Sequence, residues 1–180
     1  MTAPNLISLF RALLVPVVVW LIVTNKVQAA CFVLLIAGLS DAVDGFLAKQ
    51  FGATSELGAY LDPLADKLLL VSIFVTLGVL SHLPSWLVIL VVSRDLMIII
   101  AVVLSWMVGR PLSIKPLMIS KATTAAQMLL TVLTLAEIGF GFGFDRVLTV
   151  LVPVTALLTG LSAIAYVKSW LRHMATGIGG

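Results

Sequence analysis

Residues 41–67 read DAVDGFLAKQFGATSELGAYLDPLADK, and they lie between two apolar runs of the chain. The run before them begins at residue 27 and becomes polar only at its end, and the run after them reaches residue 80. Each run has the roughly 20 residues that a membrane-spanning helix needs. The stretch therefore predicts two antiparallel transmembrane helices that meet in a short polar connection.

The rest of the chain has the same apolar character. Of its 180 residues, 61% are hydrophobic and 11% are charged, and the mean hydropathy is +1.20. A soluble domain normally has about a quarter of its residues charged. A soluble fold of this size has too little interior to bury so much apolar surface, so we expect an all-α integral membrane protein. No linker or repeat divides the chain, which predicts a single membrane domain over residues 1–180.

Six apolar segments are long enough to span a bilayer, and polar, glycine-rich or proline-containing stretches connect them. The first segment lacks a basic start and carries Arg11, so we do not expect a cleaved signal peptide. The predicted spans are residues 6–23, 27–48, 61–80, 86–108, 117–138 and 147–171.

The 11 Lys and Arg residues divide unevenly between the two sides that six spans define. One side takes nine of them, counting residues near helix ends, and the other takes only Lys26 and Arg146. Positive residues are enriched on the cytoplasmic side of membrane proteins. The bias therefore predicts that both termini are cytoplasmic. The nine are Arg11, Lys49, Lys67, Arg94, Arg110, Lys115, Lys121, Lys168 and Arg172.

Four aspartates flank the connection between the second and third spans. Asp41 and Asp44 are spaced i, i+3 near the end of the second span, and Asp62 and Asp66 are spaced i, i+4 at the start of the third. Both spacings place a pair on one helical face. Because ionised groups in a span cost several kcal/mol each unless they are compensated, the set predicts a site for a cation.

Carboxylate oxygens suit hard ions, so Mg²⁺ or Mn²⁺ is expected, with Ca²⁺ as the alternative. His82 and His173 lie elsewhere in the sequence and do not argue for zinc. Four aspartates can hold two ions, an arrangement that steadies both oxygens in a displacement at phosphorus. Gly45, Ala48 and Gly58 would let a phosphate-bearing ligand approach the backbone, although helix packing alone also explains Gly45 or Ala48.

The stretch from Asp41 to Asp66 resembles the signature of the CDP-alcohol phosphatidyltransferases, D-x-x-D-G-x-x-A-R-x(n)-G-x-x-x-D-x-x-x-D. All four aspartates, both glycines and the alanine of that signature are present. Lys49 stands where the family usually has arginine, which keeps the charge and loses the bidentate fork. Six spans fit the usual architecture of this family, and the resemblance also implies a homodimer.

The resemblance implies an enzyme that binds CDP-diacylglycerol with two metal ions on its pyrophosphate. An acceptor hydroxyl attacks the phosphorus that bears the lipid, and CMP leaves. Asp41, Asp44 and Asp62 would be metal ligands, and Asp66 would be the general base as well as a metal ligand. The implied contacts to the CDP-lipid are Gly45, Ala48, Lys49, Gly58, Asn5 and Arg11.

Three cations outside the signature are predicted to lie on the cytoplasmic side: Arg94, Lys115 and Lys121. An acceptor that carries its own phosphate would need such groups. The alternative is that Arg94 pairs with Asp95 or snorkels to the interface, while the lysines meet anionic headgroups.

Residues 93–95, 115–116 and 120–121 read Ser-Arg-Asp, Lys-Pro and Ser-Lys. With the N-terminal pattern around Asn5 and Arg11, they resemble most the cardiolipin synthase branch of the family, which is close to the phosphatidylglycerophosphate synthases. The implied acceptor is phosphatidylglycerol, which would give cardiolipin and CMP. Glycerol 3-phosphate, which would give phosphatidylglycerophosphate, is the alternative acceptor.

The predicted location is a bacterial inner membrane, with the active site facing the cytoplasm and no nucleic-acid partner. A second class of function is an ion or proton transporter that uses the aspartates as its coupling site. Many transporters place such residues at the bilayer midplane and have repeated halves. Here the aspartates lie near one surface and no repeat is apparent, so the enzyme is the favoured hypothesis. A non-catalytic scaffold would leave the carboxylates unexplained.

Overall fold

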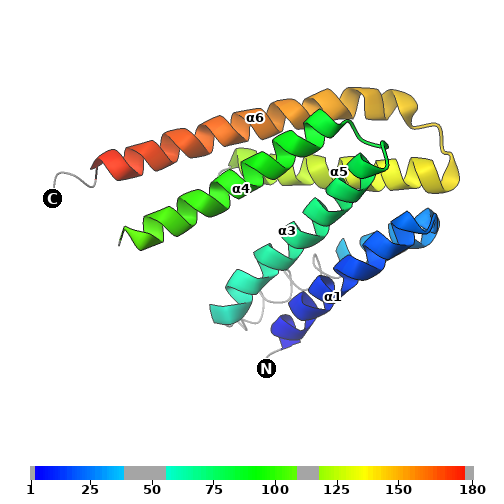
Figure 1. The fold of residues 1–180 in the computed structure, drawn as a ribbon, viewed down its shortest axis with the longest axis horizontal. Helices are drawn as coiled ribbons and strands as arrows, with labels where there is room; N and C mark the ends of the chain where they lie inside the picture. Colours follow the sequence, from blue (N-terminus) through cyan, green and yellow to red (C-terminus); the bar gives the residue numbers. More distant parts are fainter. Residues whose placement is uncertain (1–2, 39–55, 109–117, 177–180) are drawn as a thin grey trace. The chain divides into compact units, whose positions relative to one another are not determined.

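The structure is a computed structural model, and it describes the backbone of residues 3–38, 56–108 and 118–176. Side chains are described for residues 12–38, 67–108 except 102 and 106, and 118–172. The described residues form helices and connecting turns, and none of them is in a strand. The helices are α1 (Ala3–Val23), a segment at Val27–Gly38, α3 (Glu56–Val79), α4 (Ser85–Met107), α5 (Met118–Phe140) and α6 (Asp145–Thr176), as shown in Figure 1.

Three helical stretches among the described residues are long and apolar enough to cross a membrane: Ser85–Ser105, Met118–Phe140 and Asp145–Arg172. Shorter apolar helices cover Ala12–Val23, Val27–Gly38 and Lys67–Val79. The prediction of an all-helical chain with membrane-length helices is thereby confirmed for this part of the chain. The orientation of the termini stays a prediction.

Two of the described helix boundaries differ from the predicted spans by five residues, the largest difference. α3 begins at Glu56, before the predicted start at residue 61, and α6 continues to Thr176. Apolar content set the predicted limits, whereas backbone hydrogen bonding continues through polar residues. A helix of 32 residues, as in α6, measures about 48 Å at 1.5 Å per residue. It is therefore longer than the roughly 30 Å hydrocarbon core of a bilayer.

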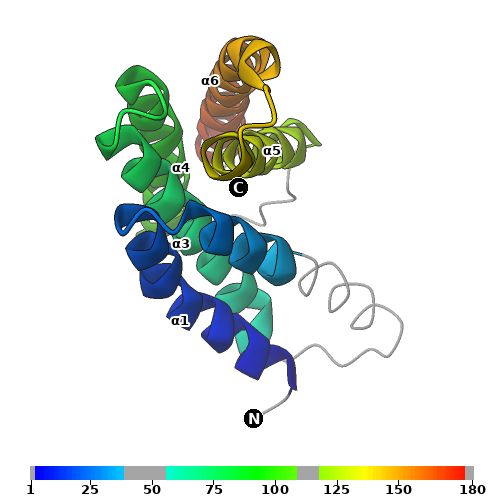
Figure 2. The ribbon, with the colours of Figure 1, turned by 90° about the vertical axis from the view of Figure 1, so that its right-hand side faces the viewer.

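The chain forms two compact units, and the first comprises residues 1–83 and 131–148. Within it α1 packs along α3, and the two helices run in the same direction (Figures 1 and 2). The buried centre of this unit consists of apolar side chains at most 1% exposed: Val18, Ile22, Ile73, Phe74 and Leu77. The N-terminal ends of α1 and α3 therefore lie at the same end of the unit.

α1 ends in a tight turn that reverses the chain into the segment Val27–Gly38. Asn25 has a φ of 60°, and the amide of Lys26 donates to the carbonyl oxygen of Leu21 at 2.8 Å. Asparagine tolerates this left-handed conformation, and hydrogen bonds of this kind satisfy carbonyl groups at the end of a helix. The turn accounts for the short connection between the first two apolar runs.

The second unit comprises residues 84–130 and 149–180. Within it α4 and α6 run in the same direction and the first part of α5 runs opposite to them (Figure 1). Small polar side chains lie in its interior, and Thr123 donates from its hydroxyl to the carbonyl oxygen of Leu158 at 3.0 Å. Helices in lipid gain no hydrophobic drive to associate, so small and hydrogen-bonding residues often form their contacts. The fully buried polar side chains described in this unit are Ser105, Thr123, Gln127, Thr155, Thr159 and Ser162.

Candidate functional site

Six of the thirteen predicted site residues fall outside the part of the chain whose backbone the structure describes. Asp41, Asp44, Gly45, Ala48 and Lys49 lie in residues 39–55, and Lys115 lies in residues 109–117. Their predicted roles therefore stay predictions.

α3 carries the other two aspartates of the signature. Asp62 and Asp66 lie in the first half of this helix, which also includes Gly58 and is continuous from Glu56 to Val79. Residues four apart on a continuous helix share one face. The helical backbone therefore has the geometry that a paired carboxylate site needs.

α1 carries the two predicted N-terminal contacts, Asn5 and Arg11, in its first half. Because α1 runs alongside α3 in the same direction (Figure 2), these positions and those of Asp62 and Asp66 belong to the same end of the first unit. Helix direction thus brings together the backbone of four predicted site residues that are separated by about fifty positions in the sequence.

The α3 carboxylates fit the predicted metal ions by their chemistry. Carboxylates offer only oxygen donors, which are the ligands that Mg²⁺ and Mn²⁺ prefer. Among the side chains that the structure describes, which do not include these aspartates, no group of three His, Cys, Asp or Glu residues could hold a metal ion. Binding of a divalent ion at the signature stays a prediction.

Among the charged side chains that the structure describes in the second unit, that of Arg94 is the least exposed. Its side chain is 1% exposed, and Nη1 lies 2.6 Å from Oδ1 of Asp95. Nη2 donates to Oγ of Ser120 on α5 and to Oγ of Ser162 on α6, both at 2.6 Å. The guanidinium also lies over the ring of Tyr166, 5.5 Å from its centroid. The pairing with Asp95, which was the alternative to acceptor binding, is present, and contact with an acceptor phosphate stays a prediction.

Lys121 lies beside this cluster in sequence but differs from Arg94 in exposure. It follows Ser120 in the first turns of α5, and its side chain is exposed. An exposed ammonium can meet an incoming anion without giving up a buried partner. Of the two described residues that are predicted to bind the acceptor phosphate, Arg94 and Lys121, only Lys121 has an exposed side chain.

Sequence reasoning did not identify the partners of Arg94 on α6. Ser162 and Tyr166 were not among the predicted site residues, yet the sequence holds a signal for them. Thr155, Thr159, Ser162 and Tyr166 are spaced i, i+4, i+7 and i+11 within an apolar segment. Such spacing predicts one polar helix face, although it does not say which charge the face meets.

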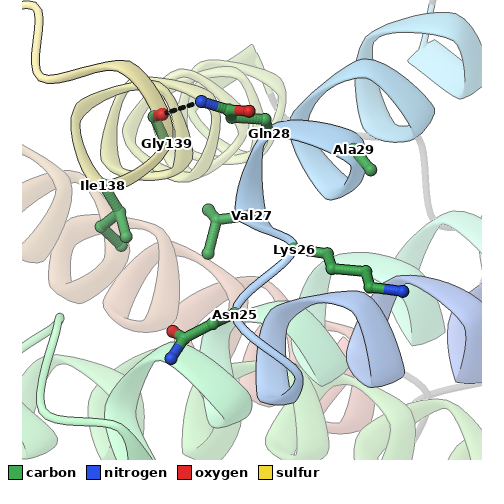
Figure 3. Close-up of a pocket in the computed structure, with 7 residues that line it drawn as sticks. All are labelled: Asn25, Lys26, Val27, Gln28, Ala29, Ile138 and Gly139. Atoms are coloured by element: carbon green, nitrogen blue, oxygen red, sulfur yellow. Dashed lines mark hydrogen bonds between the residues drawn. The ribbon is translucent and has the colours of Figure 1, made fainter.

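A cavity of about 470 Å³ lies at the other end of the first unit from the start of α1, at the turn after α1. Figure 3 shows Gln28, whose Nε2 donates to the carbonyl oxygen of Gly139 at 2.7 Å. The segment Val27–Gly38 begins at this cavity, and none of the residues that line the cavity is a predicted site residue.

Comparison with known proteins agrees with the signature. The family model described as CDP-alcohol phosphatidyltransferase matches residues 1–167. A human cardiolipin synthase (CMP-forming) is 35% identical over 92% of this chain, which spans 60% of the human protein.

Two further relatives carry a different name. A rice chloroplastic CDP-diacylglycerol–glycerol-3-phosphate 3-phosphatidyltransferase is 35% identical over 91% of the chain and 55% of its own length. The Escherichia coli (strain K12) protein of that name is 39% identical over 69% of the chain and 71% of its own length. The chain belongs to the CDP-alcohol phosphatidyltransferase family.

Proposed function

We propose that the protein moves a phosphatidyl group from CDP-diacylglycerol to the hydroxyl of phosphatidylglycerol and so forms cardiolipin and CMP. The observation that carries the proposal is the complete aspartate signature in a chain whose residues 1–167 match the family. The continuous helix through Asp62 and Asp66 supports it, because positions four apart on a continuous helix share one face.

The proposed roles follow the donor chemistry. Asp41, Asp44, Asp62 and Asp66 would hold two divalent ions, Mg²⁺ or Mn²⁺, which would supply positive charge to neutralise the pyrophosphate and stabilise the leaving oxygen. The oxygen of the acceptor hydroxyl attacks the lipid-bearing phosphorus, and the carboxylate of Asp66 accepts the proton of that hydroxyl. The phosphorus–oxygen bond to CMP then breaks, and CMP departs with the electron pair.

The remaining signature residues are proposed to bind the nucleotide lipid. Gly45, Ala48 and Gly58 have side chains small enough for close approach of a ligand to the backbone. Lys49, together with Asn5 and Arg11, is assigned to polar contacts with the CDP-lipid. The orientation of α1 beside α3 supports this assignment for the two N-terminal residues.

The acceptor phosphate requires cations, and the proposed group is Arg94, Lys115 and Lys121. The exposed Lys121 can form a direct ion pair with a phosphate. The Arg94 side chain is 1% exposed, and three of its N–H groups already bond Asp95, Ser120 and Ser162, which makes it less accessible to a phosphate. Lys121 is therefore the proposed phosphate contact on α5.

Glycerol 3-phosphate is the second candidate acceptor. The named relatives include both cardiolipin synthases and glycerol-3-phosphate phosphatidyltransferases at similar identity. The Ser-Arg-Asp triplet at residues 93–95 is what favours phosphatidylglycerol for this chain. Both acceptors have a primary hydroxyl and a phosphate, so the same residues serve either reaction.

An assay with the purified protein tests the proposal. The protein is given CDP-diacylglycerol and Mg²⁺ or Mn²⁺, with either phosphatidylglycerol or glycerol 3-phosphate as the acceptor, and the release of CMP is measured. We expect release with phosphatidylglycerol. Release with glycerol 3-phosphate alone would contradict the proposed acceptor, and no release with any alcohol would contradict the enzyme itself.

The same proposal places the enzyme in a bacterial inner membrane as a homodimer, with six spans and the aspartates at the cytoplasmic surface. The uneven division of Lys and Arg residues supports this orientation. CDP-lipid headgroups on that side would then reach the signature directly.

A further inference from the structure

Arg94 joins three helices through one side chain. It starts on α4, and its Nη2 donates at 2.6 Å to Ser120 on α5 and at 2.6 Å to Ser162 on α6. Asp95 offsets its charge at 2.6 Å, so the guanidinium can stay 1% exposed. Charge-assisted bonds of this kind are stronger than neutral ones. The bond to Ser120 therefore holds the first turn of α5, which begins at Met118.

The first turn of α5 is also the part of that helix that carries Lys121. Neighbouring residues on a helix point about 100° apart around its axis. With Ser120 directed to Arg94, the side chain of Lys121 is directed elsewhere, and it is exposed. The bond between Arg94 and Ser120 thus sets the rotation of the turn from which Lys121 extends.

Three N–H groups of Arg94 are already used by Asp95, Ser120 and Ser162. Nε of Arg94 has no hydrogen-bond partner, but it belongs to a side chain that is 1% exposed. A phosphate could reach it only if the surrounding helices moved apart, and a buried polar group that loses its partner in this way costs free energy. Arg94 is therefore better suited to act on a substrate through α5 than to touch it.

We propose that Arg94 is a positioning residue for the acceptor: by holding Ser120, it fixes the direction in which Lys121 meets the acceptor's phosphate. This inference rests on the proposed function, because it assigns Arg94 a part in that reaction. It predicts that loosening the first turn of α5 weakens use of the acceptor and leaves use of CDP-diacylglycerol unchanged.

The first experiment removes one hydroxyl. Ser120→Ala deletes the α5 partner of Arg94 and leaves the pair with Asp95 in place. We expect the KM for the acceptor to rise about fivefold, which is the size expected for one buried hydrogen bond, with kcat and the KM for CDP-diacylglycerol within about twofold of wild type. Ser120→Thr, which keeps a hydroxyl, should restore most of the affinity.

Ser105→Ala is the matched control. Ser105 on α4 is fully buried and accepts a hydrogen bond from Nε1 of Trp170 on α6 at 3.1 Å, and it has no hydrogen bond to the described part of α5. Its substitution should lower stability by a similar amount without raising the acceptor KM. An equal rise in acceptor KM in both variants would mean that general loosening of the helices is the cause, and would overturn the proposal.

A double-mutant cycle tests whether the effect passes through Lys121. If Arg94 and Ser120 act by directing this lysine, Ser120→Ala should add little to the acceptor KM of Lys121→Met, because the phosphate contact is already lost. Groups that act as one unit are non-additive, whereas independent sites add. Additive effects of Ser120→Ala and Lys121→Met on the acceptor KM would overturn the proposal.

The outcomes separate the positioning inference from the function on which it rests. If the wild-type protein releases no CMP with either acceptor, both the proposed function and the positioning role are wrong. Wild-type release, with Ser120→Ala keeping the wild-type acceptor KM, would remove only the positioning role. The readout uses phosphatidylglycerol in mixed micelles and glycerol 3-phosphate in solution, with each variant's melting temperature in detergent as the check of its fold.

Discussion

At the scale of single residues, the buried pair of Arg94 and Asp95 is the most informative feature of the second unit. A charge inside a membrane helix is costly unless it is paired, and here the carboxylate lies 2.6 Å from the guanidinium. Residues in such a pair depend on each other, because removal of one leaves the other charge buried. The pair explains how α4 can carry two charges and still be one of the most apolar helices of the chain.

Replacing one member of the ion pair should therefore destabilise the protein more than replacing both. We predict that Arg94→Met lowers the melting temperature in detergent further than the double substitution Arg94→Met with Asp95→Leu does. The single change leaves the carboxylate of Asp95 buried without its guanidinium, whereas the double change removes both charges. Equal melting temperatures for the two variants would show that leaving the Asp95 carboxylate without Arg94 carries no cost, and would contradict this prediction.

Asp66 is the residue for which the proposed chemistry makes the sharpest demand. Asp66→Asn keeps the size of the side chain but removes the base and a metal-ligating charge. We expect CMP release to fall at least about a hundredfold, the lower end of the range for a positioned acid or base, while the melting temperature stays within a few degrees of wild type.

Asp145→Asn is the matched control for that substitution. Asp145 is exposed at the first residue of α6, outside the signature, and asparagine is also a good residue at a helix start. The rate of CMP release by Asp145→Asn should stay near that of the wild type. Normal rates in Asp66→Asn would remove Asp66 from the base role.

At the scale of whole elements, the contact between α5 and the segment Val27–Gly38 depends on Gly139. A Cβ built on Gly139 would lie 3.2 Å from the backbone nitrogen of Gln28 and 3.3 Å from its Cα. These are backbone atoms at the start of a helix, so they have little freedom to move aside. The absence of a side chain at Gly139 lets the two helices approach closely enough for Gln28 to bond its carbonyl.

Gly139→Ala should accordingly destabilise the first unit by about 1–3 kcal/mol, the usual effect of overpacking. Gly160→Ala is the control, since a Cβ at Gly160 on α6 would meet nothing within 4 Å. There alanine should be neutral or stabilising because it favours helix more than glycine does. Thermal unfolding in detergent compares the two, and a Gly139→Ala protein as stable as wild type would contradict the close-contact argument.

At the scale of the whole molecule, the open question is which side of the membrane each connection faces. The predicted orientation puts Lys26 outside and the end of α6 inside. Cys31 is the single cysteine of the chain and is buried, so a Cys31→Ala background allows one reporter cysteine at a time. Lys26 is exposed in a turn, and Ala175 lies beyond the apolar stretch that ends at Arg172.

We predict that a membrane-impermeant maleimide labels Lys26→Cys in intact cells and labels Ala175→Cys only after the membrane is opened. The reason is the excess of Lys and Arg residues on the side assigned to the cytoplasm. Labelling of Ala175→Cys in intact cells would contradict the cytoplasmic C-terminus and, with it, the side assigned to the aspartates.

The amino-acid sequence by itself was sufficient for the family, for the membrane class and for most helix positions. These properties depend on local information: the spacing of Asp41, Asp44, Asp62 and Asp66, and apolar runs of about the length of a bilayer. The early start of α3 at Glu56 was missed because its first turns are polar. The sequence also contained the polar face of α6 as a spacing, but not the identity of the group that this face meets.

Only the tertiary structure decided the long-range partners. The bonds from Arg94 to Ser120 and Ser162 join residues 26 and 68 positions apart, and the bond from Gln28 to Gly139 spans 111 positions. Such contacts depend on the rotation and relative depth of packed helices, which the periodicity of one segment does not contain. The sequence could therefore show that Arg94 is a charge in need of a partner, while helix packing determined that its partners hold the start of α5.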